Sequence, residues 1–345
     1  MLDKYLDLNH DARDFFVLYL DKNVKDEEKY KRCRNEVELL FDKGILFMVE
    51  YLYKYNKEAK YDGMCFRGMA NNLLLLYELG LSKVDPIKYD LPYELFTDKS
   101  FDIEFLNYNS LDFVSSMEKN GEVFRIIKGH FEETDDDAIN ECLNDHYLII
   151  PSMFEPINMQ FRLNEYNQFE TVEDYSLFTN DFLTFKLTDK PIINEKEVDL
   201  TYALNSKFEK ELELVLNPRD MDDYVKIISL AHSTHVWKNN QDKLFKEGKI
   251  DKKNIISSRE DIYEYLINHK IEKATALDIV RQIVIKRTDE WHKLWQKYKS
   301  IMKEHNCDDM FIDIISNIIY ISGRGYAISE CLYALDADNY VMEDL

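Results

Sequence analysis

Two acidic residues stand two positions apart in a short stretch where apolar and polar residues alternate. The stretch reads Phe101-Asp102-Ile103-Glu104-Phe105, and in a strand such alternation aims residues i and i+2 at one face of the sheet. Carboxylates at Asp102 and Glu104 could therefore hold Mg²⁺ and support in-line displacement chemistry. The same two residues could instead be solvated acids on an edge strand. The elements that position them decide between the two interpretations.

The composition is that of a globular chain large enough for a substantial core. Its 345 residues are 45% hydrophobic and 32% charged, with nine glycines and six prolines, and this length suggests two domains. The longest apolar stretches, 44–53 and 73–76, are shorter than the roughly 20 residues of a membrane helix. The first 20 residues carry several acids where a secretory signal would be apolar, so no membrane association and a cytoplasmic location are expected.

Cysteine usage argues against a structural metal. The five cysteines are an odd number and include no C-x-x-C pair, so they are interpreted as buried, reduced thiols rather than zinc ligands. The acidic run 132–137 is interpreted as a solvated turn or helix start. No cofactor is expected, apart from Mg²⁺ if the chain is catalytically active.

The charge is strongly negative but unevenly distributed. The formal net charge is −22, whereas residues 226–305 carry 17 Lys and Arg against 11 Asp and Glu, a local +6. A chain so acidic repels polyanions within a Debye length of about 8 Å. Only the 226–305 segment could meet a nucleic-acid backbone.

Periodicity changes near Pro218-Arg219-Asp220. Before it, helical spacing from Glu36 to Leu52 and over 71–79, the latter ending at Gly80, predicts helices. The predicted strands of this half are 101–105, 147–150, 159–163 and 182–187. Beyond the border only helices are predicted, over 222–230, 261–268, 274–286, 288–304 and 309–321. The pattern indicates a mixed α+β domain followed by an all-helical one.

A run of polar and aromatic residues opens the helical half. Residues 230–240 read L-A-H-S-T-H-V-W-K-N-N and resemble L-S-H-G-T-D-V-W-x-G-N in the fingers of PolC, the C-family replicative DNA polymerase III of low-GC Gram-positive bacteria. The polar and aromatic positions that keep this pattern are His232, Thr234, Trp237 and Asn240. Residues 258–267, which include Arg259, are similar to that family's C-R-D-D-I-M-x-Y-L-I, and a fainter likeness continues through 311–313 and 324–327. A Trp and a His at helical spacing are also typical of core packing.

The mixed half is similar to the palm of the same family, in the same order. Residues 62–68 and 84–86 stand where the family has D-G-Y-x-V-G-S-R-G-S-V-G-S-S and E-V-N-P, and 101–107 where it has P-D-I-D-L-N-F. Residues 147–151 and 174–187 follow where it has G-I-I-V-V-P, D-Y-H-S and L-K-L-D-I-L-G.

The likeness runs from about residue 35 to 340 and implies three parts. These are an N-terminal helical extension (1–34), a palm-like α+β domain with a nucleotidyltransferase-like mixed sheet (35–219), and a helical fingers-like domain (220–345). No segment resembles the family's PHP, exonuclease or OB domains, and 341–345 contain no clamp-binding sequence of its type.

The resemblance implies a palm whose metal-binding acids are incomplete. Asp102 and Glu104 stand at two of the three positions, with Glu in place of Asp, and Lys186 stands at the third. An ammonium cannot ligate Mg²⁺ and would pair with the acids in its place. A shift of register could instead bring Asp181 or Asp189 inward.

The nucleotide-binding residues implied by the resemblance are also reduced. The phosphate-holding turn keeps Arg67 and Gly68 but loses every serine, and Arg67 could pair with the palm acids instead of phosphate. In the family's K-A-H-A-A-A-Y, which supplies positive charge near the incoming nucleotide, only Arg324 keeps a cation, and Glu330 adds an anion beside it.

The resemblance thus implies a PolC-like protein that is catalytically defective and acts as a binding or regulatory protein in DNA replication. Its partner would be a replication protein, or DNA reached through the basic 226–305 segment. One alternative is a minimal, active, metal-dependent DNA polymerase. Another is an acidic interaction protein whose likeness to the polymerase is confined to the fold.

Overall fold

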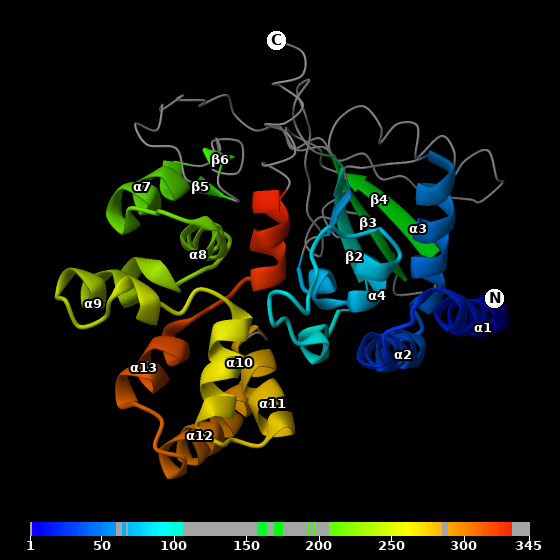
Figure 1. Cartoon of the computed structure of the whole chain (residues 1–345). Helices are drawn as coiled ribbons and strands as arrows, with labels where there is room; N and C mark the ends of the chain where they lie inside the picture. Colours follow the sequence, from blue (N-terminus) through cyan, green and yellow to red (C-terminus); the bar gives the residue numbers. More distant parts are fainter. Residues whose placement is uncertain are drawn as a thin grey trace, which may run out of the picture. The chain divides into compact units, whose positions relative to one another are not determined.

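The computed structural model describes residues 2–59, 64–66, 68–98, 100–105, 157–163, 169–174, 192–193, 196–197, 207–284 and 289–332. The chain divides into two compact units, Met1–Leu183 and Thr184–Leu345, and Figure 1 shows that helices dominate both. Each unit is described by itself below.

Helices open the first unit. They are α1 (Leu2–Asn23), α2 (Glu27–Asp42) and α3 (Leu46–Ala59). α2 begins at the N-cap Asp26, whose carboxylate accepts the N–H of Lys29 at 2.9 Å. α1 packs on both α2 and α3, and Gly44, at φ +73°, separates α2 from α3. The helical pattern between Glu36 and Leu52 is therefore divided between two helices.

Short helical turns follow and pack on α2. They are η1 (Ala70–Asn72), α4 (Leu74–Glu78) and η2 (Tyr93–Leu95). The buried carboxylate of Glu36 accepts the N–H of Leu75 at 2.7 Å and the Nε–H of Arg32 at 3.0 Å. Arg32 Nη2 also donates to the carbonyl oxygens of Asn72 and Leu91. These contacts fix the turns against α2 through backbone groups that would otherwise be unpaired.

The end of α4 is as predicted. Gly80 has φ +69°, its N–H bonds to the carbonyl of Tyr77, and the N–H of Leu81 bonds to the carbonyl of Leu76. This is a Schellman motif, which favours glycine at the left-handed position.

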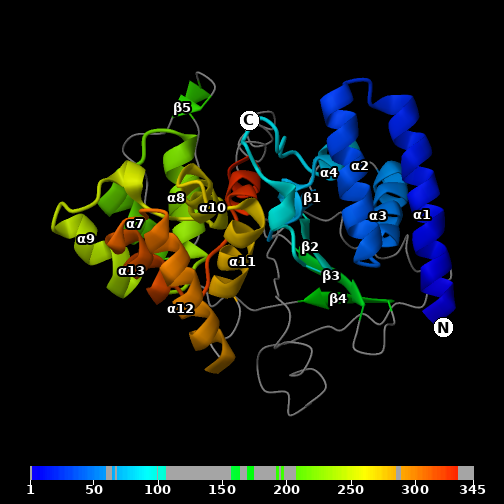
Figure 2. The same cartoon turned by 90° about the horizontal axis from the view of Figure 1, so that it is seen from below.

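The strands of the first unit form one antiparallel sheet. They are β1 (Met64–Phe66), β2 (Ser100–Phe105), β3 (Ile157–Leu163) and β4 (Phe169–Asp174), in the order β1-β2-β3-β4, visible as adjacent arrows in Figure 2. In this register Asp102 is opposite Gln160, and Glu104 lies between Cys65 and Asn158. The predicted strands 101–105 and 159–163 fall within β2 and β3, whereas 147–150 and 182–187 lie outside the described residues.

The expected α+β palm with a nucleotidyltransferase-like mixed sheet was wrong. The described part is mainly helical, and all its strand pairs, including β5 (Ile192–Ile193) with β6 (Lys196–Glu197), are antiparallel. A mixed sheet needs parallel pairs, which require long crossovers. Alternation along a segment predicts a strand but does not determine its partner or direction, and the expectation failed at that step.

The second unit is helical over most of its described length. Its helices are α7 (Lys207–Leu216), α8 (Met221–Ala231), η4 (Trp237–Gln241), α9 (Asp242–Lys246), η5 (Lys252–Asn254), α10 (Arg259–Asn268), α11 (Lys273–Val284), α12 (Asp289–Glu304), α13 (Asp309–Asn317) and residues 324–332. Side chains of Asp220, Ser258 and Asp308 cap α8, α10 and α13. Each helix predicted beyond residue 220 overlaps an observed one. The domain border at 219/220 stays a prediction, and α7 packs on α8 across it.

Two sequence expectations concern the chain as a whole. Cys33, Cys307 and Cys331 are buried and unbonded, in agreement with reduced thiols. Within the described ranges, every helix is too short or too polar to cross a lipid bilayer.

Candidate functional site

The fingers-like residues gather around an extended segment, 318–323, in the second unit. α13 stops at Asn317 because Ile318 adopts extended angles, φ −65° and ψ 133°. Thr234 then forms a β-bridge with Tyr320: its N–H donates to the carbonyl of Tyr320 at 2.8 Å and its own carbonyl accepts the N–H of Tyr320 at 3.2 Å. The helix predicted over 309–321 is thus shorter, because its last residues pair with the turn after α8.

The end of α8 reaches the same segment. The hydroxyl of Ser233 accepts the N–H of Ser322 at 2.9 Å. His232 packs its ring edge-on against Tyr326, with 5.0 Å between centroids, and its Nε2 lies 3.7 Å from a carboxylate oxygen of Glu209. His232 therefore has a packing partner and an acidic neighbour, both within the unit.

Trp237 and Asn240 are buried in the core of this unit. Trp237 is 6% exposed and its ring lies 5.6 Å from that of Phe245. Asn240 donates both amide hydrogens, to the carbonyl of His235 at 2.9 Å and to that of Ile314 at 3.0 Å. Asn240 thus ties η4 to α13, and we assign both residues a structural role.

Arg259 clamps the extended segment from the start of α10. Its backbone N–H donates to the carbonyl of Ser322 at 3.0 Å and its Nε–H to that of Ile321 at 2.9 Å. The guanidinium lies 5.6 Å from the ring centroid of Tyr320. Only 8% of Arg259 is exposed, so its guanidinium is occupied by contacts within the protein.

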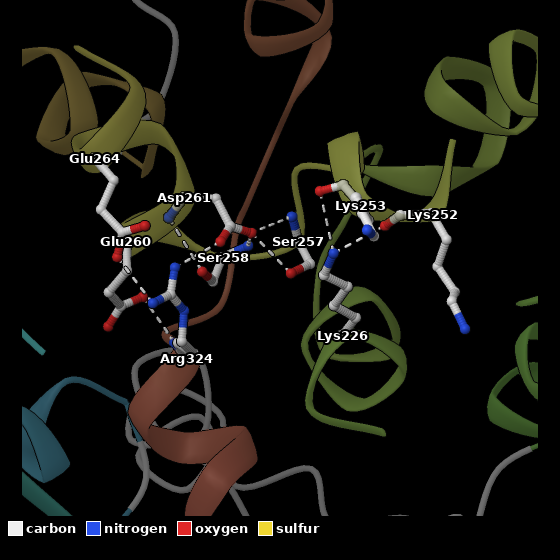
Figure 3. A network of polar contacts seen from close by, with 9 residues as sticks. All are labelled: Lys226, Lys252, Lys253, Ser257, Ser258, Glu260, Asp261, Glu264 and Arg324. Atoms are coloured by element: carbon white, nitrogen blue, oxygen red, sulfur yellow. Dashed lines mark hydrogen bonds and ion pairs between the residues drawn. The ribbon is translucent and has the colours of Figure 1, made fainter. Parts of the chain in front are cut away.

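Arg324 stands at the centre of an acidic cluster, shown in Figure 3. Its Nη2 lies 2.7 Å from Oδ1 of Asp261 and its Nη1 lies 2.8 Å from Oε1 of Glu264. Its backbone N–H donates to Oε2 of Glu260 at 2.8 Å. The guanidinium therefore pairs with two carboxylates from the first turns of α10, and a third carboxylate accepts the backbone N–H of the same residue.

The start of α10 determines where Asp261 lies. Ser258 and Asp261 form a capping box, and Oδ2 of Asp261 accepts the N–H of Ser257 at 2.7 Å, its hydroxyl at 2.8 Å and the N–H of Ser258 at 2.9 Å. The other oxygen is left for Arg324. An acid at this point also stabilises the positive end of the helix dipole.

The acidic partners of Arg324 were missed at the level of sequence. The motif S-x-x-D from Ser258 to Asp261 is a helix-start signal that could have placed Asp261 at the third helical position. No signal along the chain connects it to Arg324, which is 63 positions away.

The two charges reinforce each other. Burial by itself would raise the pKa of Asp261, but Arg324 and the hydrogen bonds from Ser257 outweigh it and hold this pKa below its usual value. Burial likewise works to lower the pKa of Arg324, and the carboxylates of Asp261, Glu264 and Glu260 outweigh it and raise this pKa. Both groups therefore stay ionised, and the positive charge of Arg324 is matched internally.

A second cluster in Figure 3 engages lysines of the basic segment. Lys226 Nζ donates to the carbonyls of Lys252 at 2.8 Å and Lys253 at 3.3 Å. Lys252 Nζ lies 2.5 Å from a carboxylate oxygen of Asp223. Lys226 and Lys252 are therefore engaged in contacts within the unit.

The palm-like residues belong to the first unit, and the structure describes some of them. Asp102 and Glu104 are two positions apart on β2. Gly68, at φ +62°, precedes η1, and a Cβ there would lie 3.5 Å from Oδ2 of Asp98. Arg67 and Lys186 lie outside the described residues. Within those residues, no three His, Cys, Asp or Glu side chains are grouped as metal ligands would be.

Known proteins match the part of the chain that holds most of this site. Residues 171–306 match the family described as bacterial DNA polymerase III alpha subunit finger domain. The DNA polymerase III PolC-type of Lactococcus lactis is 30% identical over 122 residues, 34% of this chain and 7% of that protein. That of Clostridium perfringens is 28% identical over 130 residues, 38% of this chain and 9% of that protein.

Residues 171–306 are therefore similar to the finger domain of the bacterial DNA polymerase III alpha subunit. More particularly, the matched segment is PolC-like. It covers less than a tenth of the length of either relative. Glu260, Asp261 and Glu264 lie inside the matched range, and Arg324 lies beyond it.

Proposed function

We propose that this chain is a PolC-like finger protein that acts in DNA replication by binding and does not transfer nucleotides. The observation that carries the proposal is the pairing of Arg324 with Asp261 and Glu264. By resemblance, Arg324 is the only cation left where the polymerase family supplies positive charge near the incoming nucleotide.

The cluster around Arg324 disfavours a triphosphate. Both Nη atoms already donate to carboxylates, and Glu260 accepts the backbone N–H of Arg324. A triphosphate would have to displace two charge-assisted hydrogen bonds and then face three negative side chains. Removing one partner of a largely buried ion pair costs several kcal/mol, so such displacement is unfavourable.

Nucleotide binding tests this step directly. We expect no heat of binding for Mg²⁺-dATP in isothermal titration calorimetry, up to millimolar nucleotide. Binding in the micromolar range that Arg324→Lys weakens and Arg281→Lys leaves unchanged would contradict the proposal. Arg281 is a suitable control because it is about half exposed and pairs only with Asp278 on its own helix, at 3.6 Å, among the described residues.

Primer extension tests the absence of nucleotide transfer. We expect no Mg²⁺-dependent extension of a primed template by the purified chain. Extension that Asp102→Asn abolishes and the control Asp98→Asn preserves would instead support a minimal active polymerase.

A further inference from the structure

Helix α12 has lysines along its middle and acids at its ends, Asp289 and Glu290 at the start and Glu304 at the last position. Between Trp291 and Lys303 it has four lysines and no acid. Lys293 and Lys297 are exposed and Lys299 is partly exposed. Figures 1 and 2 show α12 at the edge of its helical unit.

Three of these lysines have no acidic partner among the side chains that the structure describes, which do not include those of Asp289 and Glu290. In the ranges that the structure describes, no carboxylate lies within 4 Å of Lys293, Lys297 or Lys299, whereas Lys303 lies 3.4 Å from Asp309. Several lysines elsewhere in the basic segment are paired: Lys238 with Glu211, Lys246 with Asp242, Lys249 with Glu247 and Lys252 with Asp223. Lys243, Lys253 and Lys270 also lack a carboxylate partner there, but they lie on separate elements. Within the described part of the basic segment, α12 is therefore the element with the most lysines that lack a carboxylate partner.

The opposite face of α12 anchors the helix. Trp291, Trp295 and Tyr298 are 6%, 3% and 6% exposed, and the two indoles stack at 5.2 Å between centroids. Trp291 Nε1 donates to the carbonyl of Gln282 at 2.7 Å, and Trp295 Nε1 to the hydroxyl of Ser316 at 3.2 Å. α11 and α13 thus hold α12 in one orientation, with its lysines toward solvent.

We infer that the lysine face of α12 binds the phosphate backbone of duplex DNA. This inference rests on the proposed function, for which it supplies the binding partner. Lys293 to Lys299 span about 9 Å of helix, a length over which duplex DNA carries about five phosphate charges. Lysines act as hydrated point charges without the fixed fork of arginine, so the contact is independent of base sequence.

Neighbouring residues favour a duplex over other polyanions. The exposed residues next to the lysines in the sequence, His292, Gln296 and Ser300, are polar and can hydrogen-bond to phosphate oxygens. The aromatic residues of α12 are buried, so bases of a single strand cannot stack on them. With a net charge of −22, the chain repels DNA at long range, and attraction is confined to about one Debye length from α12. The binding is therefore strongly dependent on salt.

Two triple variants with the same change in net charge test the inference. The first is Lys293→Gln, Lys297→Gln and Lys299→Gln. The second, a matched control, is Lys238→Gln, Lys246→Gln and Lys249→Gln, whose side chains are 60%, 70% and 61% exposed but paired with acids. Circular dichroism verifies that both variants keep the helical content of the parent chain.

The affinity of each variant for DNA is measured by fluorescence anisotropy with a labelled 20-base-pair duplex, between 50 and 200 mM salt. The α12 variant should bind about tenfold or more weakly at 50 mM, and its log–log salt dependence should be shallower by about 2 to 3. The control should bind within about twofold of the parent chain.

Three outcomes overturn the inference. These are equal binding by the two variants, no duplex binding by the parent chain at 50 mM salt, and tighter binding of single-stranded DNA or polyglutamate than of the duplex. Polyglutamate binding would indicate an acidic protein partner. Failure here is distinguishable from failure of the proposed function, because nucleotide binding and primer extension are measured without reference to α12.

Discussion

Arg324 and Asp261 form an ion pair of 2.7 Å between Nη2 and Oδ1, although 63 positions separate them along the chain. Asp261 caps the start of α10, and Arg324 begins the helical stretch 324–332. The pair therefore joins two helix starts. It also matches the positive charge of Arg324 with a carboxylate inside the protein.

Removing the charge of Asp261 should destabilise the helical unit. Asp261→Asn leaves Arg324 with one fewer carboxylate in a site where each side chain is 21% exposed, and we expect a loss of about 2–4 kcal/mol in unfolding free energy. All three tryptophans lie between residues 237 and 295, so urea unfolding followed by tryptophan fluorescence reports on this unit alone. Asp309→Asn, which removes the exposed pair with Lys303, should cause a much smaller loss. Equal losses of unfolding free energy in the two variants would show that the buried ion pair stabilises the unit no more than the exposed pair does.

Acid should weaken the same unit through Asp261. Because its pKa is lower when folded than when unfolded, the folded state binds fewer protons, and the stabilisation is present above about pH 4 and lost as the pH falls through the folded pKa. The same fluorescence titrations at pH 2.5 to 6 should show a steeper loss for the parent chain than for Asp261→Asn. Parallel curves would contradict this assignment.

The first unit should respond to pH in the opposite direction. Burial raises the pKa of Glu36 from 4.5 to about 7, against the influence of Arg32 and of the N–H groups of Leu74 and Leu75. The folded state therefore binds more protons than the unfolded state, and stability falls as the pH rises from about 4.5 to about 7, by up to about 3 kcal/mol.

Glu36→Gln should remove this pH dependence. Urea unfolding followed by far-ultraviolet circular dichroism at several pH values measures it. Glu38→Gln is the control, because Glu38 pairs with arginines at the surface. If Glu36→Gln keeps the slope of the parent chain, another group causes it.

Replacing Asn240 should lower the unfolding free energy of the helical unit. Asn240→Ala leaves the carbonyls of His235 and Ile314 without this donor. The bond to Ile314 is the buried one of the two, and a buried acceptor that loses its partner costs about 1–3 kcal/mol. The expected loss of about 1–3 kcal/mol can be measured by tryptophan fluorescence. Asn239→Ala is not a suitable control because Asn239 has φ +61°, so Asn254→Ala, at an exposed position, should be used. A loss no larger than that of Asn254→Ala would refute the assigned role.

Gly80 should be sensitive to any side chain. Open space surrounds the position of a Cβ there, but φ is +69°, so Gly80→Ala should cost about 1 kcal/mol through backbone strain alone. Gly80→Asn should cost less, since asparagine tolerates this region better. Amide exchange of residues 74–81 would detect the local loss, and equal effects of the two variants would argue against strain.

Local patterns in the sequence were sufficient for several of the helices beyond residue 220, but not for α9 or for 324–332. The predicted 222–230, 261–268 and 288–304 agree within two residues with α8, α10 and α12, and Gly80 ends α4 as its backbone freedom requires. These features depend on residues within a turn or two of each other, so periodicity and capping chemistry report them. The fingers-like motif was also recognised from the sequence, and the family match confirmed it.

Long-range pairing was decided by the tertiary structure. The antiparallel order of β1 to β4, the extension of 318–323 against Thr234, and the ion pair of Arg324 with Asp261 each join segments far apart in sequence. A sequence pattern shows that a residue is suited to a strand or an ion pair, but many partners satisfy the same pattern. The choice among them depends on how whole elements pack and which buried charges and backbone groups must then be paired.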